Sequence, residues 1–364
     1  MKVGIIGTRG IPNEYGGYEQ FAEILSVALQ KRGYNIVVYN SHKHSYQEDQ
    51  FHSVRIVHCF DPEYLLGTFG QFIYDLNCIR DSRSRNFDVI FQLGYTSSSI
   101  WSWLFPKKAC IISNPDGLEY KRSKYNSAVQ YFLKHAERWM IKYSDIIMAD
   151  SVGIQKYIRK KYNKESVFIS YGADVFDDPD VSKIKEFGVE MHRYNMLIAR
   201  MEPENNIETI IKGVIASRSA LPLLVIGKYN KSYGKYLYEK YNGEKIRFLG
   251  GIYDINKLDN LRYFSNIYFH GHSVGGTNPS LLEAMASSAL ICANENEFNR
   301  GVLGVDGLYF DDHKDVSKIA EEVTKSTCEK SIFTNNLKKI KEIYSWNIIV
   351  DQVDELLRST KREK

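Results

Sequence analysis

Short apolar runs alternate with longer amphipathic runs along the chain, twice over. The first series is KVGIIG, NIVVYN, VRIVHCF, FDVIFQLG, KACIISN, DIIMADS and SVFISYG, between residues 2 and 172. The second series is NMLIARM, PLLVIG, KIRFLGG, NIYFHGH and ALICANE, between residues 195 and 295. Helical patterns, such as 17–34 and 126–144, separate most of these runs. Nearly continuous apolar strands between helices predict an α/β protein with two doubly wound, Rossmann-like domains that face each other across a cleft.

The most polar break between the two series covers residues 172–194, and we expect the interdomain linker there. This predicts an N-terminal domain over 1–180 and a C-terminal domain over 190–345. The DDPD sequence at 177–180 could be an acidic metal-binding cluster, but a solvated hinge turn is favoured. The last amphipathic segment, about 346–364, is expected to be a helix that packs back on the first domain.

Length, cysteines and apolar segments limit the class of protein. The 364 residues suit two ordinary domains. Five cysteines are scattered singly without metal-ligand spacing, which predicts buried free thiols in a reducing compartment. The start MKVGIIGTRG is predicted to be a strand and not a signal peptide. Residues 88–105 are interrupted by polar residues and predict no membrane span. We therefore expect a cytoplasmic protein.

Charge is unevenly distributed between the two halves. Residues 1–172 hold 22 Lys and Arg against 16 Asp and Glu, a balance of +6, whereas the remainder has a balance of −2. A basic first half could meet nucleic acid, anionic lipid or a phosphorylated acceptor, although ordinary surface lysines explain the balance equally well.

A glycine-rich loop, GIIGTRGIPNEYGGYE, follows the first predicted strand and opens the first helix. That placement suits anion binding at a helix N-terminus. The first three glycines are three residues apart, which is not the dinucleotide fingerprint, and the second strand ends in VVYN without an acidic residue for a ribose. A nicotinamide dehydrogenase is therefore disfavoured, and Gly16 and Gly17 become the predicted phosphate or sugar contacts.

A second strand–turn–helix boundary lies at HGHSVGGTNPSLLEAM, residues 270–285. Asn278 is the predicted N-cap, with Pro279 at the first helical position. We expect the N–H groups of Ser280 and Leu281 to be free to hold a diphosphate at the positive helix end. Glu283, one turn inside, could accept hydrogen bonds from a ribose. An ordinary capped helix with a surface glutamate fits the same pattern.

Taken together, these features resemble the family-4 retaining glycosyltransferases of the GT-B fold. The resemblance extends over nearly the whole chain and includes ARMEPENN and NPSLLEAMA. GTRGIPNEYGGYE, NPDGLEYKRSKY and GHSVGGTNPSLLEAM together resemble the branch that includes bacterial rhamnosyltransferases of capsule and O-antigen synthesis. The resemblance implies sugar transfer from a nucleotide-sugar donor to a lipid-linked glycan acceptor, with no metal and no further cofactor.

The same resemblance implies roles for individual residues. Arg200 matches the arginine that grips the donor pyrophosphate, a task that suits a permanently charged fork, although a surface salt bridge would be the ordinary use of such a residue. Glu283 matches the glutamate that binds the ribose, and residues 249–252 match the segment that contacts the base. The loop that cradles the distal phosphate and the sugar matches Gly276, Thr277, Asn278, Ser280 and Leu281.

Three positions depart from the family pattern. Gly275 stands where the first glutamate of E-x7-E is usual, and Asn205 replaces the usual pyrophosphate lysine. Lys228 or Arg9 could restore that charge. The sequence SNPDGLEYKR, 113–122, replaces a usual histidine and offers Asp116 or Glu119 as catalytic candidates, although Asp116 also fits a plain Asp-Gly turn. His270 and His272 could line the pocket or be structural.

The resemblance and Gly275 together favour dTDP-L-rhamnose as donor. A transferase of UDP- or GDP-hexoses, a GT-B sugar-nucleotide epimerase and a non-catalytic sugar-nucleotide-binding protein remain open. The basic aromatic segments 120–143 and 154–164 are predicted to dock on an anionic membrane surface, unless each is a solvated helix face. No nucleic-acid motif is present, so a nucleic-acid partner is not expected. The expected location is cytoplasmic, peripheral on the inner face of the membrane.

Overall fold

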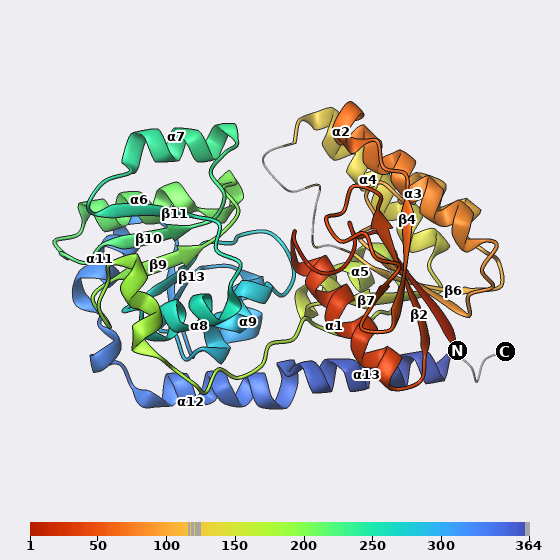
Figure 1. Ribbon diagram of the computed structural model, residues 1–364. Coiled ribbons are helices and arrows are strands. Elements are labelled where there is room, and N and C mark those ends of the chain that lie inside the picture. Colours follow the sequence, from red (N-terminus) through yellow and green to blue (C-terminus); the bar gives the residue numbers. More distant parts are fainter. Residues whose placement is uncertain (116, 118–119, 121–124, 361–364) are drawn as a thin grey trace. The chain divides into compact units, whose positions relative to one another are not determined.

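The chain folds into two compact units, as the computed structural model describes for residues 1–115, 117, 120 and 125–360. Unit 1 contains the described residues up to 171 and the helix that begins at Trp346. Unit 2 contains residues 172–345. Each unit has its own parallel sheet, and Figure 1 shows helices on both sides of each sheet.

The sheet of unit 1 has the strand order β3-β4-β2-β1-β5-β6-β7-β8. Its strands are β1 (Lys2–Ile6), β2 (Asn35–Ser41), β3 (Gln50–Phe51), β4 (Val54–Cys59), β5 (Val89–Leu93), β6 (Cys110–Asn114), β7 (Ile146–Ala149) and β8 (Val167–Phe168). The predicted parallel sheet is confirmed, with one addition: β3 pairs antiparallel with β4 at the edge. The sequence did not indicate β3, because its one apolar residue lies in the polar stretch EDQFHS.

Helices cover both faces of this sheet. They are α1 (Gly17–Lys31), α2 (Glu63–Leu66), α3 (Phe69–Ser82), the 3-10 helix η1 (Ser99–Leu104), α4 (Ser127–Tyr143), α5 (Val152–Tyr162) and α13 (Trp346–Ser359). Helix α13 lies against α1 (Figure 1), where Arg32 forms an ion pair of 3.2 Å with Asp354 and the Phe21 ring lies 6.2 Å from that of Trp346. The last helix of the chain is thus part of unit 1.

The sheet of unit 2 is parallel throughout, in the order β11-β10-β9-β12-β13-β14. Its strands are β9 (Asn195–Ile198), β10 (Leu223–Ile226), β11 (Ile246–Gly250), β12 (Tyr268–His270), β13 (Ile291–Asn294) and β14 (Leu308–Phe310). The first five lie within the predicted runs, and β14 was not predicted. This is the Rossmann order, in which the strand sequence reverses between β9 and β12.

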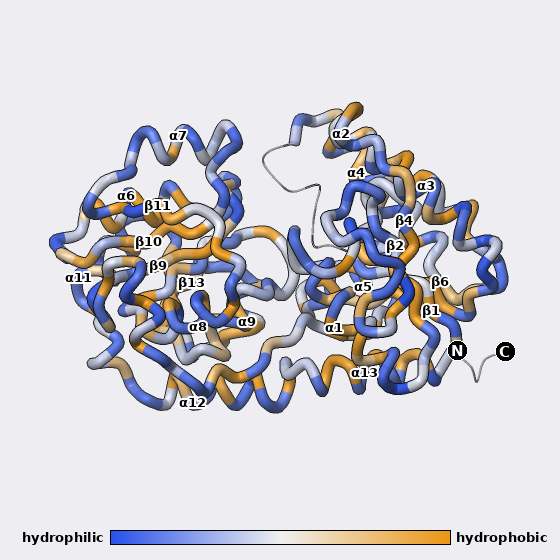
Figure 2. The backbone as a smooth tube through the Cα atoms, viewed as in Figure 1, coloured by the Kyte–Doolittle hydropathy of each residue, from blue (hydrophilic) through white to orange (hydrophobic). Residues whose placement is uncertain are grey.

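Figure 2 shows hydrophobic residues along β9 and β10 inside unit 2 and hydrophilic residues on the outer helices. The main helices are α6 (Ile207–Ala216), α7 (Ser232–Tyr241), α8 (Ile255–Phe264), α9 (Pro279–Ala286), α10 (Glu297–Leu303), α11 (His313–Glu322) and α12 (Lys330–Lys339). The 3-10 helices η3 (Val181–Phe187), η4 (Pro203–Asn205) and η5 (Lys325–Thr327) and the short π-helix η6 (Ile340–Tyr344) complete the unit. Helices α6, α7 and α11 pack on one core cluster with the strands.

Part of the predicted linker is packed structure. Ile184 of η3 is fully buried, the Asp180 N–H donates to Asn260 Oδ1 at 2.7 Å, and Glu186 pairs with Lys257 at 2.9 Å. Residues 177–180 are exposed, as expected for a solvated turn, whereas the η3 helix that follows them docks on α8 through its one buried apolar residue.

Among the described helices, none combines the length and the apolar character needed to cross a membrane.

Candidate functional site

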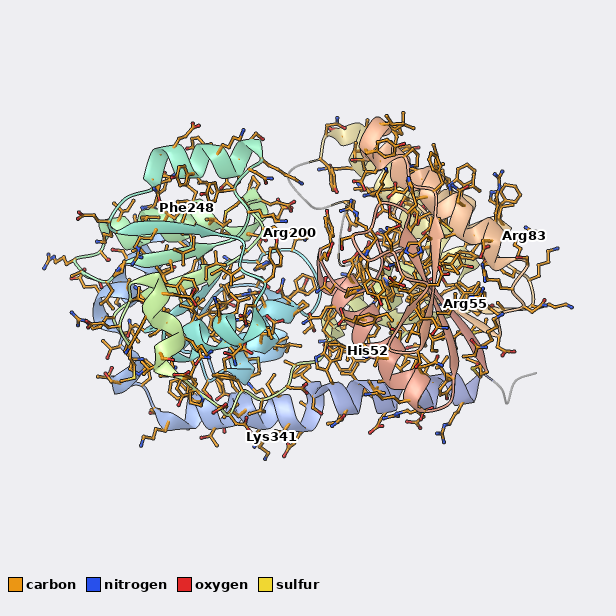
Figure 3. The ribbon with its side chains drawn as sticks, in the orientation of Figure 1. His52, Arg55, Arg83, Arg200, Phe248 and Lys341 are labelled. Atoms are coloured by element: carbon orange, nitrogen blue, oxygen red, sulfur yellow. The ribbon has the colours of Figure 1, made fainter. Side chains whose placement is uncertain are left out.

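The reversal of strand order in unit 2 brings two motifs together. Strands β9 and β12 are direct neighbours, with Met196 opposite Tyr268. The loop 199–206 follows β9 and the loop 271–278 follows β12. In doubly wound sheets, ligands bind at the carboxyl ends of the strands that flank this reversal. Figure 3 labels Arg200 beyond the sheet, in the first of these loops.

Hydrogen bonds join the two loops directly. Asn206 Nδ2 donates to the carbonyl of Gly271 at 2.9 Å, and Ser273 Oγ donates to the carbonyl of Glu204 at 2.7 Å. A Cβ at position 271 would lie only 2.0 Å from the Asn205 carbonyl oxygen, so only glycine allows this approach. The loops that carry Arg200 and the glycine-rich motif therefore form one connected edge.

Two exposed cations lie at the ends of neighbouring strands on this edge. Arg200 follows β9, and Lys228 follows β10, where its Nζ lies 5.1 Å from the centroid of the Tyr253 ring. Asn205, predicted to contact the donor in place of a lysine, is buried and donates from Nδ2 to the Arg200 carbonyl at 2.7 Å. Its observed contact closes the η4 turn, and its contact with a donor stays a prediction.

The entrance of α9 is capped as predicted, but its first amides are engaged. Asn278 Oδ1 accepts from the Ser280 N–H at 3.0 Å and from Ser280 Oγ at 2.8 Å. The Leu281 N–H donates to the Asn278 carbonyl at 3.0 Å. The expectation that these two N–H groups are free is therefore wrong, because the capping side chain and the first turn satisfy them. The helix end keeps its partial positive charge, and its first turn contains no acidic residue.

Gly275 has a backbone that explains why the usual glutamate is absent. Its φ is +131°, which L-residues rarely adopt, although an added Cβ would have no neighbour within 4 Å. Conformation, not lack of space, therefore disfavours a side chain here. A carboxylate at this position would require a different loop backbone around Gly276 and the buried Thr277.

Glu283 forms an ion pair with a buried residue that the sequence did not indicate. Its carboxylate accepts a hydrogen bond from Arg262 Nη2, and its side chain is 18% exposed. Arg262 comes from α8, is 1% exposed, and also donates from Nη1 to Asp259 Oδ1 at 2.7 Å. A charged residue on an amphipathic helix is normally predicted to be exposed to solvent. The hydropathy pattern therefore did not indicate that this guanidinium is buried.

The two predicted histidines lie at the end of β12. His270 is buried and its ring stacks on that of His272, with centroids 4.4 Å apart. Burial, together with the neighbouring His272, lowers the pKa of His270 well below its usual value, so its ring is neutral. Within the described residues, neither ring nitrogen of His270 has a hydrogen-bond partner.

The corresponding loop of unit 1 is already in contact with carboxylates from α1 and α2. Residues 7–16 follow β1, and the Arg9 N–H donates to Glu19 Oε1 at 3.0 Å. The Arg9 guanidinium pairs with Glu63 at 2.7 Å, so this candidate pyrophosphate cation has an anionic partner inside unit 1. The N–H of Gly16 donates to Asn13 Oδ1 at 3.2 Å. The predicted donor contacts of Gly16 and Gly17 stay predictions.

A buried acid lies beside the loop that follows β5, the other strand at the reversal in unit 1. Asp75 of α3 accepts a hydrogen bond from Ser97 Oγ at 2.6 Å. Burial raises the pKa of Asp75 to about 7, against a lowering by Ser97. The Asp75 carboxyl group is therefore largely protonated below neutral pH.

The two catalytic candidates, Asp116 and Glu119, lie outside the described residues. The structure gives the position of the preceding strand β6, which ends at Asn114 in the parallel sheet of unit 1.

The predicted basic aromatic segment 154–164 uses its aromatic side inside unit 1. Glu137 of α4 is buried and accepts hydrogen bonds from Tyr157 Oη at 2.8 Å, from Lys161 Nζ at 2.7 Å and from Tyr162. The expectation that these aromatic residues are available for a membrane is therefore wrong for Tyr157 and Tyr162, because a buried glutamate binds them.

Other apolar side chains of unit 1 are exposed. They lie at the end of β4, on α2, at the start of α3 and on α4, and Phe69 is 76% exposed. The set is Phe60, Tyr64, Leu65, Leu66, Phe69, Val129, Tyr131 and Trp139. The rings of Phe72 and Phe132, 5.7 Å apart, connect α3 with α4. We call this set the apolar surface of unit 1.

Comparison with known proteins gives a family model and several similar structures. Residues 1–174 match the model described as a domain of unknown function, DUF1972. No curated protein matched the chain.

Similar solved structures cover almost the whole chain. Sucrose-phosphate synthase from Thermosynechococcus elongatus matches with a TM-score of 0.84 and 15% identity over 100% of both chains. HepE of Anabaena, in complex with UDP-glucose, matches with a TM-score of 0.76 and 15% identity, over 98% of this chain and 99% of the other. WaaG, a glycosyltransferase involved in lipopolysaccharide biosynthesis, matches with a TM-score of 0.70 and 12% identity, over 96% and 99%.

At such identities the likeness concerns the fold. The strand orders of both units and these matches agree with the predicted fold class. The chain therefore has the α/β GT-B fold, with two Rossmann-like units.

Proposed function

We propose that the protein is a glycosyltransferase that moves a sugar from a nucleotide-diphosphate donor to a lipid-linked glycan. The observation that carries this proposal is the edge of unit 2 where Arg200, the capped entrance of α9 and Glu283 follow adjoining strands. That edge is where a doubly wound sheet binds a nucleotide. A solved neighbour of the same fold, HepE, was crystallised with UDP-glucose, which supports a nucleotide-sugar donor.

Each group on this edge has a chemical task in the proposal. Arg200 and Lys228 bind the pyrophosphate, the positive end of α9 faces the distal phosphate, and Glu283 accepts from the ribose. Fixed positive charge at the leaving diphosphate stabilises the developing negative charge without a metal. Asp116 or Glu119 acts at the transfer centre, and the sugar keeps its anomeric configuration.

We further propose dTDP-L-rhamnose as the donor. Gly275 supplies no carboxylate for the hydroxyls of a common hexose, and such hydroxyls would be left without a buried partner. A 6-deoxy sugar could instead place its methyl group against the backbone of residues 274–276. The competing donors are UDP- and GDP-hexoses.

A panel of sugar nucleotides tests the reaction and the donor together. dTDP-rhamnose, UDP-glucose, UDP-galactose and GDP-mannose are incubated with the full chain at equal concentration and followed by mass spectrometry and NMR. Hydrolysis or transfer of dTDP-rhamnose with retained configuration supports the proposal. Preferred turnover of a hexose donor, or an inverted anomeric centre, contradicts the donor or the stereochemistry. Epimerised sugar nucleotide, or no reaction, supports the epimerase or the binding protein.

We also propose that the protein reaches its lipid-linked acceptor from a peripheral position on the inner, anionic face of a membrane. The apolar surface of unit 1 lies beside basic residues of α4, such as Lys134 and Lys142, which suits insertion at a lipid headgroup boundary. Vesicle co-sedimentation should increase with anionic lipid and decrease with salt, because salt screens the attraction. Replacing Leu65 and Phe69 by serine should reduce it, and equal binding to neutral vesicles would contradict the charge argument.

A further inference from the structure

Arg262 is a charged side chain in the interior of unit 2. It is 1% exposed and bridges two helices, since it contacts Asp259 on its own helix α8 and Glu283 on α9. An unpaired charge in such a place would strongly destabilise the fold, whereas a guanidinium with hydrogen-bonded carboxylates is tolerated. The interior of unit 2 therefore contains a charge that packing alone does not require.

The electrostatics keep this guanidinium ionised. Burial opposes its charge, but the carboxylates of Glu283 and Asp259 outweigh burial, so the pKa of Arg262 lies above its usual range. Burial also raises the pKa of Asp259, against the favourable charge of Arg262. One cation thus serves two carboxylates, and both are partly accessible, with side-chain exposures of 20% and 18%.

The geometry of the guanidinium fixes a direction for Glu283. Arginine presents its donors in a rigid planar fork, so Nη1 on Asp259 determines where Nη2 points. A glutamate on an exposed helix face would otherwise sample several rotamers, and ordering it would reduce the affinity for a ligand. Arg262 removes that loss because Glu283 is ordered before the ligand binds.

We propose that Arg262 is a positioning residue, which orients the Glu283 carboxylate to accept a hydrogen bond from the ribose 3′-hydroxyl of the nucleotide donor. This inference rests on the proposed function, because it takes a nucleoside diphosphate as the ligand of this edge. Asp259 is the second anionic partner of the guanidinium. Its Oδ1 also accepts a hydrogen bond of 3.2 Å from Ser287 Oγ, which lies at the end of α9.

A purely structural ion pair between α8 and α9 makes a different prediction. Its loss would lower the stability of unit 2 and weaken all nucleotides by the same factor. Loss of a positioning residue instead removes the discrimination between nucleotides that have the 3′-hydroxyl and nucleotides that lack it. The ratio of two dissociation constants therefore separates the two roles.

The probes are thymidine diphosphate and its 3′-deoxy analogue, and UDP and its 3′-deoxy analogue, measured by calorimetry on the full chain. We expect the wild type to prefer the hydroxyl-bearing member about 10-fold, as a hydrogen bond to a charged acceptor allows. Arg262→Gln and Glu283→Gln should each reduce that preference to about 2-fold or less. Arg300→Gln is the matched control, because Arg300 pairs with Glu295 at 2.6 Å on the surface of the same unit, and it should keep the wild-type ratio.

Arg262→Lys keeps the charge and provides a test if Arg262→Gln does not fold. A lysine is a single flexible point charge and cannot hold two carboxylates in fixed directions, so the ratio should fall. Adding Asp259→Asn leaves the lysine with Glu283 as its one anionic partner in this triad, and the ratio should recover. Thermal unfolding confirms that each variant is folded.

The outcomes distinguish a failure of the positioning role of Arg262 from a failure of the proposed function. If the wild type binds none of the four nucleotides, the proposed function fails. If the wild type binds them without preference for the 3′-hydroxyl, both the ribose contact of Glu283 and the positioning role of Arg262 are wrong, although the nucleotide-diphosphate donor stands. If folded Arg262→Lys and Arg262→Gln keep the wild-type ratio, the positioning role alone is wrong. If the Arg262 variants bind all four nucleotides more weakly by the same factor, so that the ratio of dissociation constants is unchanged, the Arg262–Glu283 contact is a structural ion pair.

Discussion

The two sheets of this protein reverse their strand order in the same way, yet the helix entrances beside the reversals differ in charge. In unit 1, the first turn of α1 contains Glu19, which accepts from a loop amide, and its N-terminal position Gly16 has no capping side chain. In unit 2, the first turn of α9 contains no acid, and Asn278 caps it. Equivalent positions in one architecture therefore differ in how well they suit an anion, and the entrance of α9 in unit 2 is the better candidate for a phosphate.

The neighbouring side chains extend this contrast. Arg9 of unit 1 is paired with Glu63, and the buried Asp75 lies beside the next loop. Arg200 and Lys228 of unit 2 are exposed at the ends of adjacent strands. The strand order makes both edges candidate sites, and the local charges decide between them.

The largest effect is expected from Arg200→Ala. The variant should lose about 2–4 kcal/mol of nucleoside-diphosphate affinity, since it removes the charged contact that we propose between Arg200 and the pyrophosphate. Calorimetry with UDP and thymidine diphosphate measures this loss. Arg218→Ala is the control, because Arg218 is a 91% exposed cation of the same unit, and it should bind as the wild type does. Wild-type affinity in Arg200→Ala would remove the assignment of the anion to this edge.

The second effect concerns the pH dependence of unit 1. Asp75 has a folded pKa of about 7, above its unfolded value near 3.8, so the native state keeps a proton that the unfolded chain releases. Stability should therefore fall as pH rises from about 4 to about 7 and then level off. Asp75→Asn lacks this loss and should be more stable than the wild type at pH 8, by up to about 4 kcal/mol. Thermal unfolding at pH 4 and pH 8 measures the difference, and equal differences at both pH values would contradict a raised pKa.

A smaller effect is expected from the helix caps. Asn278→Ala removes the acceptor of the Ser280 N–H and should cost about 1 kcal/mol of stability. Asn126→Ala removes the equivalent cap of α4 in unit 1, where the side chain accepts from the Val129 N–H, and should cost a similar amount. Nucleotide affinity should change only in Asn278→Ala. A change of equal size in both variants would mean that affinity follows global stability.

The smallest effect is expected from Glu19→Gln. Removal of this charge should change nucleotide affinity by less than about 2-fold, because the phosphate lies on unit 2 in the proposal. If α1 of unit 1 were the phosphate site, loss of the carboxylate would tighten binding several-fold. Calorimetry therefore reports directly on the contrast between the two helix entrances.

The sequence predicted the fold class because strands that are buried on both faces leave continuous apolar runs, as in NIVVYN and PLLVIG. It did not predict β3 or β14, because polar residues lie on both sides of them, in EDQFHS and DGLYFDD, and interrupt any longer apolar run. It placed the cap at Asn278 correctly, since Asn before Pro is a local signal.

The site itself was less accessible from the sequence. Arg262 and Asp75 are charged or titratable residues on helices, and a hydropathy pattern assigns such residues to solvent, whereas tertiary packing buries them. The engagement of the Ser280 amide depends on the rotamer of Asn278. The φ of Gly275 depends on how its loop closes. These are properties of three-dimensional packing that residue spacing does not encode.

The return of α13 to unit 1 has a consequence for how the chain is made. The residues that pair with Arg32 and pack on Phe21 leave the ribosome only after all of unit 2. During synthesis, the face of α1 that α13 covers stays open to water and to chaperones, although the sheet of unit 1 is already complete. Unit 1 can therefore complete its packing only after the last helix has been synthesised. A nascent chain arrested before Trp346 should be more sensitive to protease at α1 than the released chain.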